Sequence, residues 1–438
     1  MKVVVVGGGK TGISVANFYR KMGHKVIIND IKREEEFTPE ELKSIKAVAE
    51  FAGGGHSREL LNSADRIVVS PGVPPGLIKN LVEDEEKLKG DIEDAYEWVG
   101  GNVIGVTGTK GKTSFSLLIS KVLEEEGYKV FTGGNIGTPY IDAYGKNCDY
   151  IVLELSSFQL EWVERFHPKI AILLNLKPDH LDRYKDMKEY FSAKVKIFKN
   201  QEKGDIAILS AEIPFINTLN LKSDCFFFST EREVERGAYK ISEKVKVNVK
   251  KEKEFIFDRD VLLRVLSWEN LLAYLVFSEA FGIKEETYIK VLKSFKPPPH
   301  RLQKIGEWKG IEFFNDSKST TPASVMNALK ILDAPIILIM GGRNKNLSFY
   351  ELREEIGKKA KAVLLFGESK EEIKGEIKNC GAEIFVTNTL DEAVQLAIKI
   401  GQKGDRVLFS PGCASFDMFR NYEERGEKFI EAVRRFTG

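Results

Sequence analysis

The sequence predicts an α/β protein built from three domains. Short, almost continuously apolar segments, such as 3–7, 102–107 and 336–340, alternate with amphipathic segments of helical length. Strands of this kind are typical of parallel sheets that helices cover on both faces. A chain of 438 residues suits about three domains, and the run Lys296-Pro297-Pro298-Pro299-His300 predicts a stiff, extended connector before the last one. We therefore expect domains over residues 1–93, 94–297 and 298–438.

A glycine-rich loop follows the first predicted strand. Its spacing, Gly7-x-Gly9-x-x-Gly12, precedes a predicted helix, and Asp30 ends the next predicted strand. This pattern is typical of Rossmann-like domains, in which the backbone approaches a diphosphate at the start of a helix. Lys10 is larger and more charged than the residue expected inside such a loop. The sequence therefore predicts a site for a diphosphate, of NAD or of another molecule, with a tight turn that binds no ligand as the alternative.

The stretch GVTGTKGKTS, over 105–114, connects a buried strand to the start of a helix. It departs from the standard phosphate-loop pattern because a valine stands where the first glycine is expected. The other features are retained. Gly108 and Gly111 can expose backbone N–H groups to phosphates. Lys112 can neutralise the β- and γ-phosphates, and the Thr113 hydroxyl can hold Mg²⁺. We expect a P-loop-type ATPase sheet in the central domain, with a glycine-rich turn that binds no ligand as the alternative.

Two polar side chains are expected at the carboxyl edge of the central sheet. Glu154 lies near the end of the apolar strand 150–155, where a carboxylate is unfavourable unless it meets a cation. His180 follows the next buried strand, over 170–175. We expect Glu154 to help hold Mg²⁺, whereas for His180 the sequence favours a metal role no more than an ordinary solvated loop histidine. For Glu154 the alternative is a strand-end carboxylate that faces solvent.

Lys194 stands out on a predicted helix over 186–199. It lies in the middle of an apolar stripe that includes Tyr190, Phe191 and Phe198. A lysine on a buried face either extends to solvent or has its charged form disfavoured by desolvation. A neutral amine can react with CO₂ to form a carbamate, which would be a carboxylate-like metal ligand. The sequence alone leaves both outcomes open.

The chain beyond residue 213 has two parts. Residues 213–263 contain short alternating segments, so we expect β-hairpins there. After the proline connector, Arg301 could reach a transferred phosphate and Asp316 could hold a ribose. Ser415 follows the last strand, at a helix start that could bind a carboxylate; ordinary helix caps are the alternative for these positions. A C-terminal Rossmann-like domain is expected with strands over 311–315, 336–340, 362–366, 383–387 and 405–410.

The bulk composition argues against several classes of partner. A formal net charge of +1 gives no support for a nucleic acid or a membrane surface attracted by charge. No apolar run is long enough to span a bilayer, and the N-terminal run is too short for a signal peptide. The four cysteines have no metal-ligand spacing. We expect a reduced, cytoplasmic protein without a disulfide framework.

Together these motifs resemble the Mur ligases of peptidoglycan synthesis. The resemblance runs through all three expected domains. Within the family, the run Ser410-Pro411-Gly412-Cys413-Ala414-Ser415-Phe416-Asp417 favours the members that add D-glutamate. The other motifs that carry the resemblance are 105–113, Gly133-Gly134-Asn135-Ile136-Gly137, Leu153-Glu154-Leu155-Ser156-Ser157-Phe158-Gln159-Leu160, Asp179-His180-Leu181-Asp182-Arg183-Tyr184, Pro299-His300-Arg301 and Asn315-Asp316-Ser317-Lys318.

The resemblance implies a role for each matching residue. The family often has His-Asn shortly before the position of Asn270, but here Ser267-Trp268-Glu269 precedes it, so only Asn270 of that pattern remains for the adenine side. Lys112, His180, Lys194 and Arg301 would be catalytic. ATP would contact Gly108, Thr109, Lys110, Gly111, Lys112, Thr113, Ser114, Asn270, Arg301 and Asp316; Mg²⁺ would be held by Thr113, Glu154, His180 and Lys194 as its carbamate. The UDP-sugar would contact Thr11, Asp30, Ser70, Gly72, Asn135, Ser156 and Gln159, and D-glutamate would contact Thr320, Lys345, Ser415, Phe416 and Tyr422.

The implied reaction is amide formation driven by ATP, by a monomer that joins D-glutamate to UDP-N-acetylmuramoyl-L-alanine through an acyl phosphate. Three alternatives remain. A different Mur ligase or a folylpolyglutamate synthase would use the same phosphate loop. An NAD-dependent oxidoreductase would explain only the first thirty residues. A nucleotide-binding protein without activity would retain the loops but not the turnover.

Overall fold

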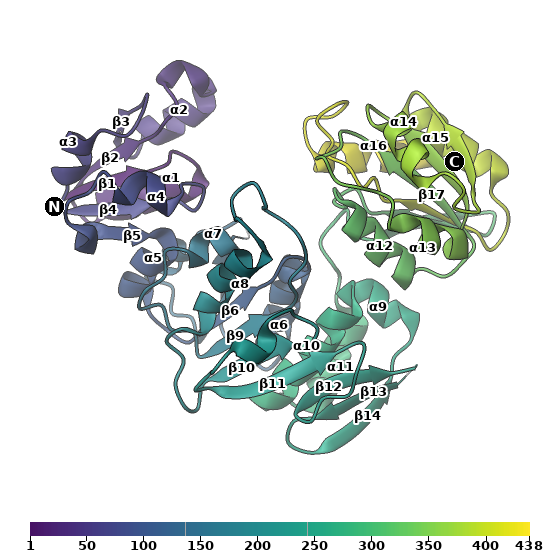
Figure 1. The fold of residues 1–438 in the computed structure, drawn as a ribbon, viewed down its shortest axis with the longest axis horizontal. Helices are drawn as coiled ribbons and strands as arrows, with labels where there is room; N and C mark the ends of the chain where they lie inside the picture. The colour runs from purple at the N-terminus through teal and green to yellow at the C-terminus, as the bar shows by residue number, and fades with distance from the viewer. Residues whose placement is uncertain (136, 243) are drawn as a thin grey trace. The chain divides into compact units, whose positions relative to one another are not determined.

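The computed structural model describes residues 1–135, 137–242 and 244–438. Ile136, which belongs to the expected motif 133–137, lies outside them. The chain divides into two compact units: unit 1 is Met1–Phe257 with Trp268–Ser294, and unit 2 is Asp258–Ser267 with Phe295–Gly438. The described residues form three sheets, two in unit 1 and one in unit 2 (Figure 1). The predicted α/β class is confirmed.

The first sheet of unit 1 is parallel throughout, with the strand order β3-β2-β1-β4-β5. The four valines at positions 3–6 are all buried, as expected for a central strand covered on both faces. Its strands are β1 Lys2–Val6, β2 Lys25–Asn29, β3 Glu50–Ala52, β4 Arg66–Val69 and β5 Leu88–Gly90; its helices are α1 Lys10–Lys21, α2 Pro39–Lys46, α3 Arg58–Asn62, α4 Pro75–Lys79 and α5 Asp91–Val99.

The second sheet of unit 1 carries the phosphate loop. Its strand order is β14-β13-β12-β11-β10-β9-β6-β8-β7, parallel from β7 to β12. Its strands are β6 Val103–Thr107, β7 Val130–Gly134, β8 Tyr150–Glu154, β9 Ile170–Leu173, β10 Ile206–Ser210, β11 Asp224–Ser229, β12 Gly237–Ile241, β13 Lys244–Asn248 and β14 Glu252–Ile256; its helices are α6 Lys112–Glu125, α7 Ser157–Leu160, α8 Met187–Val195, α10 Trp268–Phe281 and α11 Glu285–Ser294. Short 3₁₀ turns occur at η1 Glu34–Glu36, η2 Glu85–Lys87, η3 Tyr140–Ala143, η4 Lys196–Phe198 and η5 Ile216–Thr218.

The expected β-hairpins over 213–263 are only partly found. β12, β13 and β14 form an antiparallel ribbon, which is the predicted β-rich part. β11 instead pairs in parallel with β10 and β12, so it extends the main sheet. The segment then ends in a helix, α9 Arg259–Val265, because the Asp258 side chain accepts a hydrogen bond from the Val261 N–H and caps its first turn.

Unit 2 is one six-stranded sheet with helices, in the order β15-β16-β20-β17-β18-β19. Only β15 runs antiparallel to its neighbour among the described strands of this sheet. Its strands are β15 Gln303–Trp308, β16 Ile311–Asn315, β17 Ile336–Gly341, β18 Ala360–Phe366, β19 Glu383–Val386 and β20 Arg406–Phe409; its helices are α9, α12 Pro322–Ile331, α13 Leu352–Lys359, α14 Lys370–Ile377, α15 Leu390–Ile400 and α16 Tyr422–Thr437.

Within the described ranges, no single helix is long and apolar enough to cross a membrane. Among the helices of the described residues, the bent pair α9 and α10 reaches the required length and composition when the two are taken together.

Candidate active site

The loop between β6 and α6 has the backbone conformation that its glycines predict. Gly108 and Gly111 have φ angles of +149° and +84°, which side-chain-bearing residues rarely adopt. A Cβ at Gly111 would lie 2.7 Å from the Asn270 side-chain oxygen, so another residue here would have to displace Asn270 as well as adopt a strained backbone conformation. The Lys112 ammonium turns back over the loop and donates to the carbonyl oxygens of Gly108 (2.9 Å) and Thr109 (3.0 Å). The loop thus presents N–H groups and a cation at the start of α6, which is the chemistry of a phosphate site.

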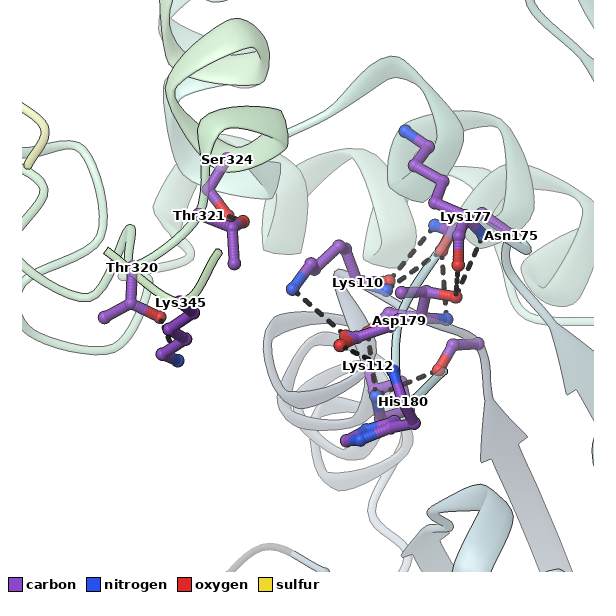
Figure 2. Close-up of polar contacts among 12 residues, drawn as sticks. Lys110, Lys112, Asn175, Lys177, Asp179, His180, Thr320, Thr321, Ser324 and Lys345 are labelled. Atoms are coloured by element: carbon purple, nitrogen blue, oxygen red, sulfur yellow. Dashed lines mark hydrogen bonds and ion pairs between the residues drawn. The ribbon is translucent and has the colours of Figure 1, made fainter. Parts of the chain in front are cut away.

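Asn175 holds this loop in place, and the sequence analysis gave it no role. Its side-chain oxygen accepts from the N–H groups of Thr109 (3.1 Å) and Lys110 (2.9 Å), while its amide nitrogen donates to the Lys110 carbonyl (3.1 Å). Asn175 is buried and follows β9, the parallel neighbour of β6. Figure 2 shows its side chain directed at the Lys110 backbone. The sequence feature that could have indicated a role for Asn175 is its position as a polar residue at the end of a buried strand.

Glu154 is buried at the end of β8 and is 3% exposed. One carboxylate oxygen accepts from the Thr113 hydroxyl (2.8 Å), and the other accepts from the Asn135 amide (2.8 Å). The solvent-facing alternative for Glu154 is therefore wrong. Carboxylate and hydroxyl oxygens are ligands that Mg²⁺ prefers, so Glu154 and Thr113 fit a magnesium ion next to the phosphate loop.

Lys194 is also buried, at 1% exposure, so it does not extend to solvent. Its ammonium donates to the Gly108 carbonyl (2.9 Å), the same oxygen that Lys112 contacts, and lies 4.7 Å from the centre of the Tyr190 ring. Burial, and secondarily the charge of Lys112, lower the pKa of Lys194 well below its usual range. The amine is thereby shifted towards the neutral form that reacts with CO₂.

His180 lies on the loop after β9 and is exposed. Its ring contacts that of Phe158, with the centroids 4.7 Å apart. Loss of hydration at the ring lowers its pKa, which favours the neutral imidazole that can bind a metal. Beside it, Asp179 forms an ion pair with Lys110 at 3.4 Å (Figure 2). Burial alone would raise the pKa of Asp179, but the charges of Lys110 and His180 and the hydrogen bonds from these two residues together lower it. Within the described ranges, no cluster of three or more His, Cys, Asp or Glu side chains is arranged to hold a metal.

The N-terminal glycine loop is tightly packed against the neighbouring strand ends. A Cβ at Gly12 would lie 1.9 Å from the Gly7 carbonyl, and one at Gly7 would lie 2.8 Å from the Ser70 Cβ. Asp30 accepts from the Gly8 N–H at 2.6 Å, so its carboxylate lies next to the loop. A cavity of about 560 Å³ opens over this loop and is lined in part by Gly8, Gly9, Lys10, Asp30, Lys32 and Phe37. Its size suits a nucleotide.

The expected sugar-binding residues occupy different environments. Thr11 is partly exposed and Gly72 is exposed, and Asn135 is exposed but bonded to Glu154. Gln159 is buried: its amide nitrogen donates to Asp91 (2.9 Å), and its oxygen accepts from the Ser156 N–H (3.1 Å). Burial raises the pKa of Asp91 to about 7. Gln159 therefore links α7 to the start of α5.

In unit 2, Asp316 lies at the carboxyl end of β16 and is 4% exposed. Its oxygens accept from the Leu302 N–H (3.1 Å) and from the hydroxyls of Ser319 (2.5 Å) and Ser410 (2.8 Å), and burial raises its pKa to about 6. These bonds tie three strand-end segments together. The adjacent Arg301 has a buried Nε that makes no hydrogen bond to any described residue.

The residues expected to bind D-glutamate follow the strands of unit 2. Lys345 donates to the Thr320 hydroxyl at 3.4 Å (Figure 2), Ser415 is buried, and Phe416 is 66% exposed. Burial raises the pKa of Tyr422, at the start of α16, to about 12.

Arg425 is a buried residue that the sequence analysis missed. Its guanidinium donates to the Ser317 carbonyl (2.8 Å), the Ser317 hydroxyl (3.1 Å) and the Cys413 carbonyl (3.0 Å). It forms no ion pair with any described residue, and burial lowers its pKa to about 10. Arg425 joins the segments after β16 and β20. In the sequence, the one feature that could have indicated this linking role of Arg425 is its position near the start of α16.

Comparisons with known proteins agree with this architecture. The MurD-like N-terminal domain of Mur ligases matches residues 1–82, the Mur ligase middle domain matches 106–269, and the Mur ligase glutamate ligase domain matches 300–413. The matched N-terminal and middle domains argue against an oxidoreductase.

Similar proteins of known name support the same assignment. A UDP-N-acetylmuramoylalanine–D-glutamate ligase from Pelotomaculum thermopropionicum is 36% identical and covers 99% of this chain and 97% of the relative; one from Koribacter versatilis is 38% identical, covering 100% and 98%. Among solved structures, a MurF ligase from Thermotoga maritima in complex with ADP has a TM-score of 0.62 at 17% identity, covering 94% of this chain and 95% of that one. The MurC ligase of the same organism has a TM-score of 0.59 at 18% identity and covers 99% of both chains. Three matched domains and full-length relatives above 30% identity show that this chain belongs to the Mur ligase family.

Proposed function

We propose that this protein is an ATP-dependent ligase that joins D-glutamate to UDP-N-acetylmuramoyl-L-alanine in peptidoglycan precursor synthesis. Full-length relatives that bear the name of this activity support the choice of substrates. The observation that carries the reaction class is the meeting of Lys112 and Lys194 at one carbonyl of a phosphate loop, next to the Glu154–Thr113 pair.

The reaction begins with activation of the alanyl carboxylate. The γ-phosphoryl group of ATP passes to this carboxylate, which gives an acyl phosphate and ADP. The amine of D-glutamate then attacks the acyl carbon, phosphate leaves, and the new amide nitrogen loses its proton. Lys112 exchanges its two loop carbonyls for phosphate oxygens, and Arg301 adds a second cation. Asn175 holds the loop in shape by accepting from the Thr109 and Lys110 N–H groups, which leaves the later N–H groups of the loop for the phosphates.

Thr113 and Glu154 would hold a first Mg²⁺, and His180 with carbamylated Lys194 would hold a second. Bound there, Mg²⁺ neutralises the charge that develops on phosphoryl oxygens. The chain's own contribution is a buried carboxylate, a hydroxyl and an amine whose charged form is disfavoured. Carbamylation would join the neutral Lys194 nitrogen to the carbon of CO₂ and release one proton, so that a neutral amine next to Lys112 becomes an anion.

Each of the three expected domains binds a different substrate. Residues 1–93 bind the UDP-sugar through Thr11, Asp30, Ser70 and Gly72, and residues 94–297 bind ATP and add Asn135, Ser156 and Gln159 to the sugar site. Residues 298–438 bind D-glutamate through Thr320, Lys345, Ser415, Phe416 and Tyr422. The enzyme acts as a cytoplasmic monomer.

A phosphate-release assay tests the proposal. Release from ATP should require both UDP-N-acetylmuramoyl-L-alanine and D-glutamate, and Lys112→Ala should abolish it while binding of the UDP-sugar persists. Stimulation by meso-diaminopimelate in place of D-glutamate would identify a different ligase of the family. No turnover of the unmodified protein with every substrate present would favour a nucleotide-binding protein without activity.

A further inference from the structure

Arg183 is a largely buried cation to which the proposed reaction gives no role. It lies three residues after His180, on the loop between β9 and α8, and its side chain is only 14% exposed. The two residues before it, Leu181 and Asp182, are exposed. Because burial of a guanidinium is unfavourable unless polar groups surround it, the partners of Arg183 indicate what this residue does.

The first partner of the guanidinium is Glu161, the residue after α7. The Nε and Nη2 atoms of Arg183 donate to the two carboxylate oxygens of Glu161, the Nε at 3.3 Å. The Tyr184 hydroxyl donates to the same carboxylate at 2.6 Å, and the guanidinium carbon lies 4.6 Å from the centre of the Phe158 ring. A two-point pair of this kind fixes the plane of a guanidinium as well as its position. Arg183 is therefore held firmly against residues 158–161.

The second partner is the turn that carries His180. His180 has a φ of +55°, in the left-handed region that residues other than glycine rarely adopt. Its carbonyl accepts from the N–H groups of Arg183 and Tyr184, both at 3.0 Å. Its ring lies 4.7 Å from that of Phe158, which also contacts the guanidinium. A shift of Arg183 would therefore reach His180 through the backbone of the turn and through Phe158.

The third partner belongs to the N-terminal sheet. The Nη1 atom of Arg183 donates to the Gly72 carbonyl at 3.3 Å, across 111 positions in the sequence. Gly72 is exposed and lies after β4, in the segment Ser70-Pro71-Gly72 that we expect to contact the UDP-sugar. Exposed backbone after a strand adjusts more easily to a ligand than the strand itself. Arg183 thus connects a carbonyl that can respond to the sugar with the strained turn at His180.

We propose that Arg183 is a positioning residue that couples binding of the UDP-sugar at residues 70–72 to the placement of His180. The inference rests on the proposed function, because it takes the UDP-sugar as the ligand and His180 as a group of the active site. A sugar bound against residues 70–72 fixes the Gly72 carbonyl. This carbonyl fixes the guanidinium, which in turn holds the His180 turn. The His180 imidazole is thereby brought into its working position by the substrate.

The His180 imidazole can be observed directly in full-length protein labelled with ¹⁵N-histidine. Its signal, identified by its loss in His180→Gln, should shift when UDP-N-acetylmuramoyl-L-alanine is added without nucleotide. In Arg183→Met this shift should be lost, although calorimetry should still detect binding of the UDP-sugar. Lys185→Met, which removes an exposed cation from the same loop, is the matched control and should respond as the unmodified protein does.

A conservative variant separates positioning from support of the fold. Arg183→Lys keeps a positive charge beside Glu161, but an ammonium cannot form the two-point pair and reach the Gly72 carbonyl at the same time. It should therefore retain most of the thermal stability and still lose the His180 shift. In turnover, Arg183→Met should lower kcat about 10- to 100-fold, the loss typical of residues that hold an active-site group in place. It should change KM for the UDP-sugar much less.

The outcomes separate the two proposals. If the unmodified protein does not bind the UDP-sugar, the proposed function fails, and the role of Arg183 fails with it. If the sugar binds but leaves the His180 signal of the unmodified protein unmoved, or shifts it equally in Arg183→Met, only the role of Arg183 is refuted. A lower melting temperature of Arg183→Met with a normal His180 shift and a normal kcat would also refute it, because Arg183 would then only support the fold.

Discussion

Replacement of Lys194 by alanine tests the least usual feature of the site. The Lys112 and Lys194 nitrogens each lie 2.9 Å from the Gly108 oxygen, so they are at most about 5.8 Å apart. At an effective dielectric constant of about 20, two unit charges at this distance repel by about 3 kcal/mol. A carbamate on Lys194 would convert this repulsion into an attraction of similar size. The pair is therefore most stable when the buried Lys194 is not an ammonium.

We expect Lys194→Ala to lower kcat about 100-fold or more, since losses of 10- to 100-fold are typical even for residues that only support a metal ligand. Acetate or formate should restore part of the activity, because a small carboxylate can occupy the space left by the carbamate. Lys188→Ala, an exposed position on the same helix, is the matched control and should be fully active and insensitive to acetate.

A direct measurement makes the test independent of activity. The unmodified protein incubated with ¹³C-bicarbonate should give a carbamate signal in its ¹³C spectrum, and Lys194→Ala should lack that signal. Because the neutral amine is the reactive form, incorporation should fall as the pH is lowered. Absence of the signal at saturating bicarbonate, together with no rescue by acetate, would refute the carbamate and leave Lys194 as a structural lysine of the phosphate loop.

Three further predictions concern the remaining geometry. Asn175→Ala removes three hydrogen bonds to the phosphate loop; we expect ADP affinity measured by calorimetry to fall about 10-fold or more, with a loss of about 1–3 kcal/mol in unfolding free energy, and unchanged affinity would show that the loop holds its shape alone. Gly111→Ala combines a φ of +84° with a Cβ 2.7 Å from the Asn270 oxygen, so ATP binding should be lost, and a crystal structure with an undisturbed loop would contradict this. Burial raises the pKa of Asp316 to about 6, above its unfolded value of 3.8, so the folded state binds the extra proton. Its stabilisation is therefore present below about pH 4 and is lost as the pH rises through about 6; relative to Asp316→Asn, the unmodified protein should lose unfolding free energy across this window, and parallel thermal-unfolding curves would contradict the assignment.

The sequence predicted the parts of this site that depend on local spacing. Lys194 could be placed on a buried stripe because the period of a helix relates it to Tyr190 and Phe191 without knowledge of the rest of the fold. Asn175 could not be recognised in the same way, because its role depends on the parallel pairing of β9 with β6. Arg425 depends on three segments that meet only in the folded sheet of unit 2. The same limit applies to Gln159, whose bond to Asp91 joins residues 68 positions apart.

The valine in the phosphate loop has a structural explanation. Val106 is fully buried and lies inside β6, where it pairs with Glu154 on one side and Ile172 on the other. A strand interior does not need a glycine at this position, and a side chain there contributes to the core. The turn begins two residues later, at Gly108, whose φ of +149° and close approach to Leu174 require a glycine.

The position of that turn has a consequence for the chemistry. It places the Gly108 carbonyl where both Lys112 and Lys194 reach it at 2.9 Å. One backbone oxygen thereby links Lys112 of the phosphate loop to Lys194 on α8. With valine in place of the first glycine, residue 106 packs in the core as part of β6. The turn then starts at Gly108, whose carbonyl connects the phosphate loop to helix α8 through Lys194.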